Sequence, residues 1–161
     1  MEHIEIREVT TGDVGFLFRL MNDPVVLKAL HEVPTRPSDW EEAVAAWLAD
    51  EDEQGYIIFD REVPVGWFAV NGLLAEDGMA FLKMAVLLPA YQNRKIGSYV
   101  LAHIMGELKA AGFTALGLFT DQDNARAQAC YKKCGFRVVE SLEERMSDGA
   151  VVARYRMERR L

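Results

Sequence analysis

Short stretches of the chain alternate apolar and polar residues, and this period of two predicts β-strands. The first runs from His3 to Val9, with Ile4 and Ile6 separated by charged residues. Six further stretches are strongly apolar or alternating and are bounded by turn residues. They predict strands over residues 56–59, 63–74, 80–88, 116–120, 136–142 and 150–157, of which 56–59 and 63–74 form a hairpin.

Other stretches repeat apolar residues every three or four positions, which is the spacing of one helix face. They predict four helices, over residues 14–21, 40–48, 96–111 and 124–134. Asn22-Asp23-Pro24 is expected to end the first helix, and an irregular stretch with Pro34 and Pro37 follows it. The resulting order, β-α-α-β-β-β-α-β-α-β-β, predicts an α/β (α+β) fold without internal repeats or linkers.

Length and composition limit the class of protein. The chain has 161 residues, which suits a single domain over residues 1–161. Its net charge of −7 argues against generic binding to nucleic acid or to an anionic membrane. The N-terminus is charged where a signal peptide would be apolar, and no apolar run is long enough for a membrane span, so a cytoplasmic protein is expected.

The cysteines and the distribution of charge add two expectations. Cys130 and Cys134 lie four residues apart in one predicted helix, so they indicate neither a disulfide framework nor a zinc site, and no metal is expected. Residues 1–60 contain fourteen acidic and four basic residues, a balance of −10, whereas residues 61–161 contain eleven and fourteen, a balance of +3. The two parts are therefore candidates for binding different ligands.

The segment after the strand at 80–88 has a layout typical of phosphate binding. Pro89-Ala90-Tyr91 leads into Gln92-Asn93-Arg94-Lys95-Ile96-Gly97-Ser98, which opens the long helix. A glycine-containing turn at a helix start presents free backbone N–H groups and the positive end of the helix dipole. The segment is neither a Walker A loop nor a dinucleotide fingerprint. A plain strand-to-helix turn with solvated basic residues is the alternative interpretation.

Two segments resemble the GNAT superfamily of acetyl-CoA-dependent N-acetyltransferases. Residues 89–98 are similar to motif A, whose loop reads Q/R-x-x-G-x-G/A: Gln92 and Gly97 match, and Lys95 replaces the first glycine. Either that position does not need a positive φ here, or the local geometry is shifted. Residues 124–136 resemble motif B, N-x-x-A-x-x-x-Y-x-K-x-G-F. The matching positions are Asn124, Ala127, Tyr131, Lys133, Gly135 and Phe136.

The resemblance implies a GNAT fold, with a single mixed, mostly antiparallel sheet of about seven strands flanked by about four helices. It implies transfer of an acetyl group from acetyl-CoA to a primary amine of a small molecule, peptide or protein. The amine would attack directly in a ternary complex, without a metal or a covalent enzyme intermediate. A catalytically silent module that binds acetyl-CoA as a sensor or scaffold is the rival hypothesis.

The resemblance also assigns roles to residues. The strand backbone would pair with the pantetheine arm, the loop N–H groups would hold the pyrophosphate, and Asn124 would contact the cofactor arm. The residues expected to bind acetyl-CoA are Ala85, Val86, Leu87, Gln92, Asn93, Arg94, Lys95, Ile96, Gly97, Ser98 and Asn124. Tyr131 is the expected catalytic residue, because its phenol can donate a proton to the departing thiolate. A backbone amide near Val86 could polarise the thioester carbonyl.

The acceptor side is less well specified. In some family members a glutamate five residues before the motif B asparagine removes the proton of the amine, but this chain has Phe119 there. Substitutes for that base are Asp121, Asp123, His31 and Glu32, and the expected acceptor contacts are His31, Glu32 and Asp121. The acidic excess in residues 1–60 suggests a cationic amine, with solvated helix faces as the alternative. A homodimer is common in the family, although no residue pattern here indicates one.

Overall fold

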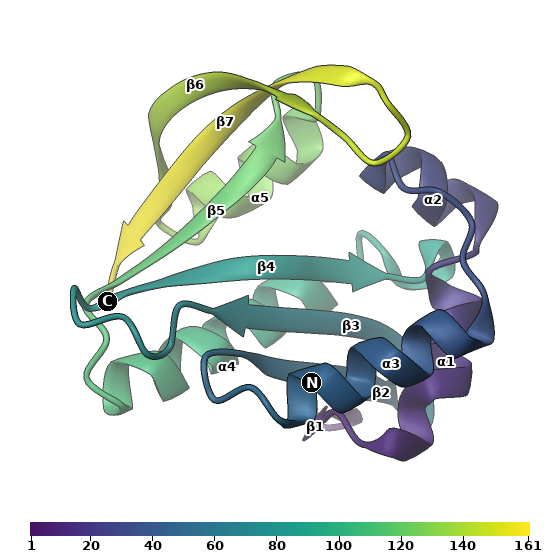
Figure 1. Ribbon diagram of the computed structural model, residues 1–161. Coiled ribbons are helices and arrows are strands. Elements are labelled where there is room, and N and C mark those ends of the chain that lie inside the picture. The colour runs from purple at the N-terminus through teal and green to yellow at the C-terminus, as the bar shows by residue number, and fades with distance from the viewer.

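Seven strands form one sheet in the order β1-β2-β3-β4-β5-β7-β6, and helices lie on both of its faces (Figure 1). The computed structural model describes all residues from 1 to 161. The strands are β1 (Ile4–Glu8), β2 (Gln54–Asp60), β3 (Val63–Asn71), β4 (Met79–Leu87), β5 (Ala115–Asp121), β6 (Arg137–Arg145) and β7 (Val151–Arg160). Every neighbouring pair is antiparallel except β4 and β5. The predicted α/β fold with a mixed, mostly antiparallel sheet of seven strands is confirmed.

Five α-helices are present, one more than the sequence pattern predicted. They are α1 (Val14–Leu20), α2 (Pro24–Leu30), α3 (Pro37–Leu48), α4 (Ile96–Ala110) and α5 (Ala125–Lys133), with short 3-10 turns at Thr11–Asp13 and Pro89–Tyr91. None of these helices has both the length and the apolar character that crossing a membrane would require.

The additional helix, α2, arises because Pro24 begins a helix instead of ending one. Proline at the first helical position lacks only an N–H that would be unsatisfied there in any case. The Asp23 carboxylate accepts from the N–H groups of Val25 and Val26, at 2.9 and 3.1 Å, and so caps the new helix. Pro37 likewise occupies the first position of α3, which therefore starts three residues before the predicted Trp40.

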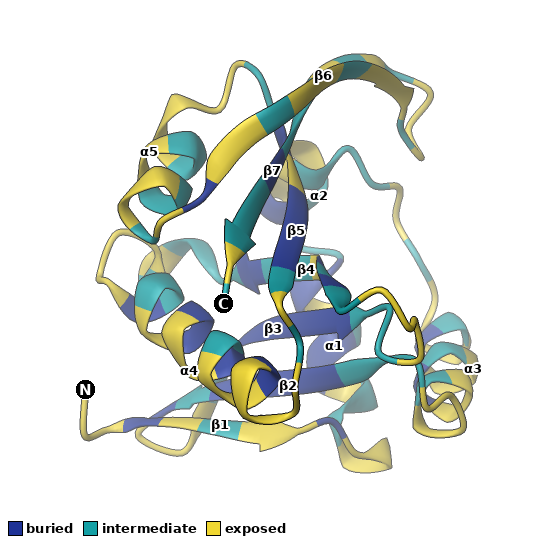
Figure 2. Cartoon of the chain, turned by 90° about the vertical axis from the view of Figure 1, so that its left-hand side faces the viewer, coloured by how far each residue is buried: buried dark blue, intermediate teal, exposed yellow.

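Two apolar cores lie on opposite faces of the sheet (Figure 2). The larger one joins the strands to α4 and includes the stripe that the helical spacing predicted, which is Val100, Leu101, Ile104 and Leu108. The other joins β2, β3 and β4 to α1 and α3, through Leu17, Trp40 and Trp67 among others. In Figure 2 the buried positions concentrate in the central strands, while β6 is largely exposed.

The sheet opens between its two central strands. β4 pairs with β5 only through Met79–Phe81 and Ala115–Gly117, and beyond these residues the two strands diverge (Figure 1). A register shift in the β3–β4 ladder leaves Lys83 unpaired as a β-bulge. Because a bulge exchanges the two faces of a strand, Leu82 packs in the core with α4, whereas Val86 packs in the core with α1 and α3. We call β5, β6, β7 and α5 together the C-terminal arm.

Candidate active site

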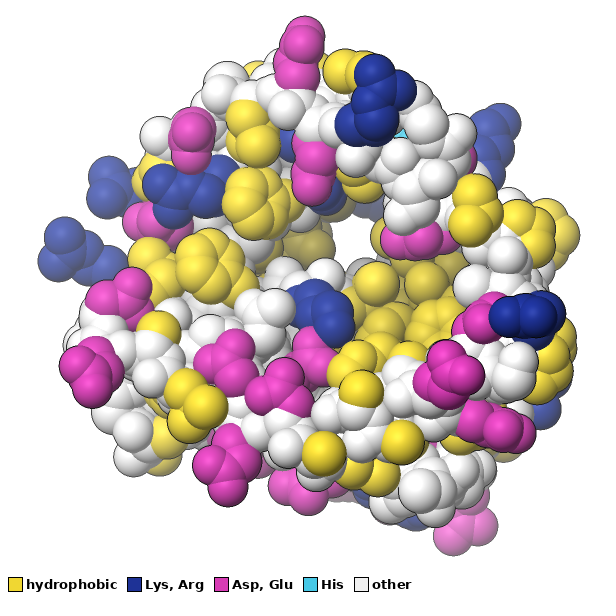
Figure 3. Space-filling model, in the orientation of Figure 1, with side chains coloured by type: hydrophobic (Ala, Val, Ile, Leu, Met, Phe, Trp, Pro, Cys, Tyr) yellow, Lys and Arg dark blue, Asp and Glu magenta, His cyan; other side chains and the backbone are white.

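A cleft of about 930 Å³ occupies the opening between β4 and the C-terminal arm. It is lined by the end of β4, the loop before α4, the first turn of α4, residues 123–127, one side of α5, and α2. Figure 3 shows the hollow between the two halves of the molecule, bordered by apolar side chains. The two motifs that are far apart in the sequence therefore face one common space.

The loop at residues 92–98 is built to accept an anion. None of the six backbone N–H groups from Asn93 to Ser98 donates a hydrogen bond to another group of the chain. Asn93 and Lys95 have left-handed backbones, with φ of 60° and 65°, on either side of Arg94. Alternating conformations of this kind turn successive N–H groups inward to form an anion-binding nest, and the start of α4 adds its dipole. The phosphate-binding interpretation therefore has a specific geometric basis.

Lys95 adopts the conformation for which the family motif supplies glycine. Its φ of 65° and ψ of 7° place it in the left-handed region as the N-cap of α4. Of the two possibilities that the sequence left open, the first is wrong: the position does take a positive φ. A lysine there bears a conformational strain that glycine would avoid.

Replacing Lys95 with glycine is expected to raise the free energy of unfolding by about 0.5–1 kcal/mol, because the strain is relieved while some backbone entropy is lost. The affinity for acetyl-CoA is expected to fall, since Lys95 lines the cleft beside the free N–H groups. Chemical denaturation and calorimetric titration measure the two effects. A variant that unfolds more easily than the wild type would contradict the assignment of strain.

The end of β4 presents backbone groups to the cleft. The Leu88 N–H donates to the Val65 carbonyl at 2.8 Å, so alternation along the antiparallel ladder also pairs Val86 with Trp67 on β3. The N–H and C=O groups of Ala85 and Leu87 therefore point away from β3, to the side where β5 has diverged. The Gln92 side-chain amide donates to the Leu87 carbonyl at 3.0 Å and ties the loop to this strand end. A donor polarising a carbonyl would be an amide of Ala85 or Leu87, next to the predicted Val86.

Asn124 lies on the cleft as predicted, but its side chain already has a structural partner. The side-chain oxygen accepts from the Ala127 N–H at 3.1 Å and caps α5. The amide NH₂ group donates to no other group of the chain. Asn124 can therefore hold α5 and still offer a donor to a ligand.

Tyr131 projects from α5 toward the cleft and packs edge-on against Phe136, with ring centroids 5.9 Å apart. Its hydroxyl makes no hydrogen bond with another residue. Burial raises the pKa of Tyr131 to about 12, with a smaller contribution from the neighbouring thiols of Cys130 and Cys134. The phenol is consequently a neutral donor over the physiological pH range, with its hydrogen bond uncommitted.

Two of the predicted cofactor residues do not contribute side chains to the cleft. Ile96, the first residue of α4, has its side chain buried in the larger core. The Arg94 guanidinium lies over the Tyr91 ring, 5.2 Å from its centroid, and 3.9 Å from the buried Asp60 carboxylate. Only the backbone groups of these two residues belong to the anion nest. The other predicted cofactor residues line the cleft with their side chains or backbone. They are Ala85, Val86, Leu87, Gln92, Asn93, Lys95, Gly97, Ser98 and Asn124.

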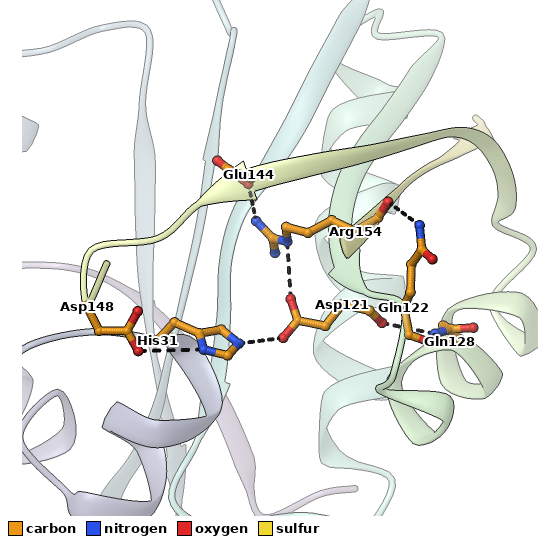
Figure 4. A network of polar contacts seen from close by, with 7 residues as sticks. All are labelled: His31, Asp121, Gln122, Gln128, Glu144, Asp148 and Arg154. Atoms are coloured by element: carbon orange, nitrogen blue, oxygen red, sulfur yellow. Dashed lines mark hydrogen bonds and ion pairs between the residues drawn. The ribbon is translucent and has the colours of Figure 1, made fainter. Parts of the chain in front are cut away.

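The predicted acceptor residues lie beside the cleft and mostly contact one another. His31 and Asp121 are 90 positions apart in sequence, yet His31 Nε2 is 2.8 Å from Asp121 Oδ2 (Figure 4). The side chain of Glu32 forms no ion pair or hydrogen bond. Among the four proposed substitutes for the catalytic base, Asp123 is the one that lines the cleft.

Many acidic residues of the N-terminal part have structural partners. Asp13 and Asp23 cap helices, and Asp52 accepts from the N–H groups of Gly72 and Leu74. Asp39 forms a capping box with Arg36, and these hydrogen bonds hold the pKa of Asp39 below its ordinary value. Four of the fourteen acidic residues in residues 1–60 therefore have a structural role at a turn or a helix start.

The sequence did not predict that α2 forms a wall of the cleft, and it did not predict two polar pairings near the site. Val26, Ala29 and Leu30 line the cleft, although the segment was expected to be irregular. Arg154 on β7 lies with its Nε 3.2 Å from Asp121 Oδ1, and Ser98 Oγ lies 3.4 Å from Cys130 Sγ. Proline at position 24 after a capping aspartate was the available signal for α2; the other two pairings have no local signal. No group of three or more His, Cys, Asp and Glu residues is arranged to bind a metal ion.

Solved structures with the same fold include several acetyltransferases. Spermidine N-acetyltransferase from Vibrio cholerae, in complex with CoA and spermine, superposes with a TM-score of 0.89 at 18% identity over 99% of this chain and 96% of that one. An acetyltransferase from Thermus thermophilus gives 0.80 at 21% identity, over 98% and 97%. The ribosomal-protein-S18-alanine N-acetyltransferase from Escherichia coli gives 0.75 at 19% identity, over 98% and 93%.

No curated protein sequence matches the chain. The sequence model of the acetyltransferase (GNAT) family matches residues 19–136, which is most of the chain and contains both motifs. Together with the seven-stranded sheet that opens between β4 and β5, this match shows that the protein belongs to the GNAT family of acetyltransferases.

Proposed function

We propose that this protein transfers the acetyl group of acetyl-CoA to a primary amine by direct attack of the amine on the thioester. The observation that carries the proposal is the cleft itself, in which one strand edge, an anion nest and an uncommitted tyrosine hydroxyl face the same space. Bound acetyl-CoA would supply the activated acetyl group.

The donor side follows from the fixed polar groups. The N–H groups of Asn93 to Ser98 suit a pyrophosphate, because they are free, clustered and aided by the dipole of α4. The backbone of Ala85 and Leu87 suits the amide groups of a pantetheine arm, which would pair along β4 in place of the missing β5 contacts. Their N–H groups are also placed to polarise a carbonyl.

The raised pKa of Tyr131 sharpens its proposed role. At about 12 it exceeds the pKa of an ordinary thiol, about 8.5, by about 3–4 units, so complete proton transfer to a thiolate would be uphill by about 5 kcal/mol. A hydrogen bond from the phenol to the sulfur avoids that transfer and still stabilises the negative charge that develops there. Tyr131 therefore acts as a hydrogen-bond donor to the leaving thiolate.

The acceptor must lose a proton before it attacks. An amine with a pKa near 10.4 is neutral in only about one molecule in 2,500 at pH 7, whereas one near 7.7 is neutral in about one in six. Asp123 is the carboxylate that lines the cleft and forms no ion pair, so it is the group we assign to receive that proton. A less basic amine would depend on it less.

Release of free CoA thiol tests the proposal. Purified protein is mixed with acetyl-CoA and a panel of amines that includes spermidine, an N-terminal alanyl peptide, a lysyl peptide and an aminoglycoside. Amine-dependent thiol release by the wild type is the expected result. Calorimetric binding of CoA without release for any amine would favour the rival hypothesis, a catalytically silent acetyl-CoA-binding module.

A further inference from the structure

One residue, His31, joins the N-terminal part of the chain to the C-terminal arm. Residues 1–60 and 115–161 share three polar contacts, and all three involve His31. Its Nε2 is 2.8 Å from Asp121 Oδ2, its Nδ1 is 3.7 Å from Asp148 Oδ2, and its carbonyl accepts from the Asp148 N–H at 3.1 Å. Figure 4 shows the imidazole between the two carboxylates.

Asp121, the closer partner of His31, has several polar contacts within the C-terminal arm. Arg154 Nε lies 3.2 Å from Asp121 Oδ1, and Arg154 Nη1 donates to Glu144 at 2.7 Å (Figure 4). Behind Asp121, the Gln128 amide donates to the Asp121 carbonyl at 2.9 Å. The Asp121 and Arg154 side chains are only 14% and 18% exposed, so little solvent screens this pairing. The arm thus presents to the imidazole a carboxylate that is already paired with Arg154.

His31 is held in a strained backbone conformation. It follows the last turn of α2 with φ of 54° and ψ of 39°, and the Glu32 N–H bonds back to the Leu27 carbonyl at 3.0 Å. This is a Schellman ending, in which glycine is the usual residue at the left-handed position. A histidine there is disfavoured by about 1 kcal/mol, so its imidazole contacts must offset the strain.

The contacts of His31 also show what it does not do. Both ring nitrogens face carboxylates, and neither the imidazole nor Asp121 lines the cleft. An imidazole so placed has no nitrogen directed at an amine in the cleft. The effect of His31 on the reaction must therefore pass through the element to which it is attached.

That element is α2, which forms one wall of the cleft. It contributes Val26, Ala29 and Leu30, and the donor-binding groups occupy the opposite side. A helix of seven residues is too short to be stable alone, and Val26 is its only buried residue. Val26 and Leu30 pack against the core, and polar contacts of the Asp23 cap and of His31 hold the two ends of α2.

We propose that His31 is a positioning residue that locks α2 against Asp121 and Asp148 and so fixes the wall on which the acceptor amine binds. This inference rests on the proposed function. It assigns the predicted acceptor residues His31 and Asp121 to the placement of the acceptor wall, and leaves direct contact with the amine to residues that line the cleft.

The variant His31→Gly tests the lock, because glycine fits the left-handed position and the imidazole is removed without adding backbone strain. Glu62→Gly is the matched control, since Glu62 also has a positive φ, of 69°, and lies in the exposed turn between β2 and β3. Hydrogen exchange without substrates is expected to be faster in residues 24–30 of His31→Gly and unchanged in the control. In turnover, the acceptor KM is expected to rise about tenfold while the acetyl-CoA KM stays within about twofold.

Asp121→Asn retains the shape of the partner but removes its charge. It is also expected to speed hydrogen exchange in residues 24–30 and to raise the acceptor KM. Wild-type exchange in α2 together with a wild-type acceptor KM in His31→Gly would overturn the lock, as would an equal loss of affinity for both substrates. Failure of the proposed function is distinguishable, because it would appear as absent turnover in the wild type. The exchange measurement would then still decide whether His31 holds α2.

Discussion

Replacing Tyr131 with phenylalanine is expected to lower kcat about 100-fold and to leave acetyl-CoA affinity within about twofold of the wild type. The hydroxyl makes no hydrogen bond within the chain, so its loss leaves no buried partner unsatisfied and the ring keeps its packing on Phe136. The loss of about 2.7 kcal/mol would fall on the transition state alone, where charge accumulates on sulfur. Steady-state kinetics with a saturating amine and direct binding measurements separate the two quantities.

The same tyrosine gives a pH signature. Because its pKa is raised to about 12, the phenol stays protonated at pH 9–10, and the Tyr131-dependent part of the rate is expected to remain constant there. The ratio of wild-type to Tyr131→Phe kcat should therefore not fall between pH 7 and 10. An unchanged kcat in the variant would remove Tyr131 from the mechanism, and a ratio that fell near pH 8 would contradict the raised pKa of Tyr131.

Placing a negative charge in the anion nest is expected to weaken acetyl-CoA binding about 30-fold or more. Gly97 lies in the first turn of α4, and a Cβ added there would meet only the Leu87 Cδ1 atom, at 4.0 Å, so Gly97→Asp fits sterically. A carboxylate about 5 Å from a bound pyrophosphate would be repelled by about 2 kcal/mol or more, even with substantial screening.

Gly97→Asn separates charge from shape in this test, because asparagine has nearly the same size without the charge. Its affinity for acetyl-CoA is expected to stay within about fivefold of the wild type, and the defect of Gly97→Asp should shrink as salt increases. Isothermal calorimetry at two ionic strengths measures both effects. Equal defects in the two variants would show that the site is steric and would remove the anion nest from the proposal.

Helices and strands that pack against the core could be predicted, because their buried side chains recur at a regular spacing in the sequence. α4 was predicted from the spacing of Val100, Leu101, Ile104 and Leu108, all of which are buried. α2 was not, because seven residues with one buried side chain produce no stripe, and Pro24 was interpreted as an end. A proline after a capping aspartate is as typical of a helix start as of a helix end.

The donor side of the site could be predicted from local motifs, whereas the polar network around His31 could not. Gln92, Gly97, Asn124 and Tyr131 lie in segments whose spacing carries information, and all four line the cleft. The pairing of His31 with Asp121 joins residues 90 positions apart, and nothing in either segment specifies the other. The acidic excess of residues 1–60 cannot by itself specify a cationic acceptor, since helix caps and turns use the same carboxylates.

Transfer of an isotopically labelled acetyl group tests the central claim most directly. Deuterated acetyl-CoA and the amine panel are incubated with the wild type, and mass spectrometry follows the label in every product. The predicted result is labelled N-acetyl amine in an amount equal to the CoA released, with the protein itself unlabelled. Label that remained in acetyl-CoA, or appeared only as free acetate, would contradict transfer to an amine in this cleft.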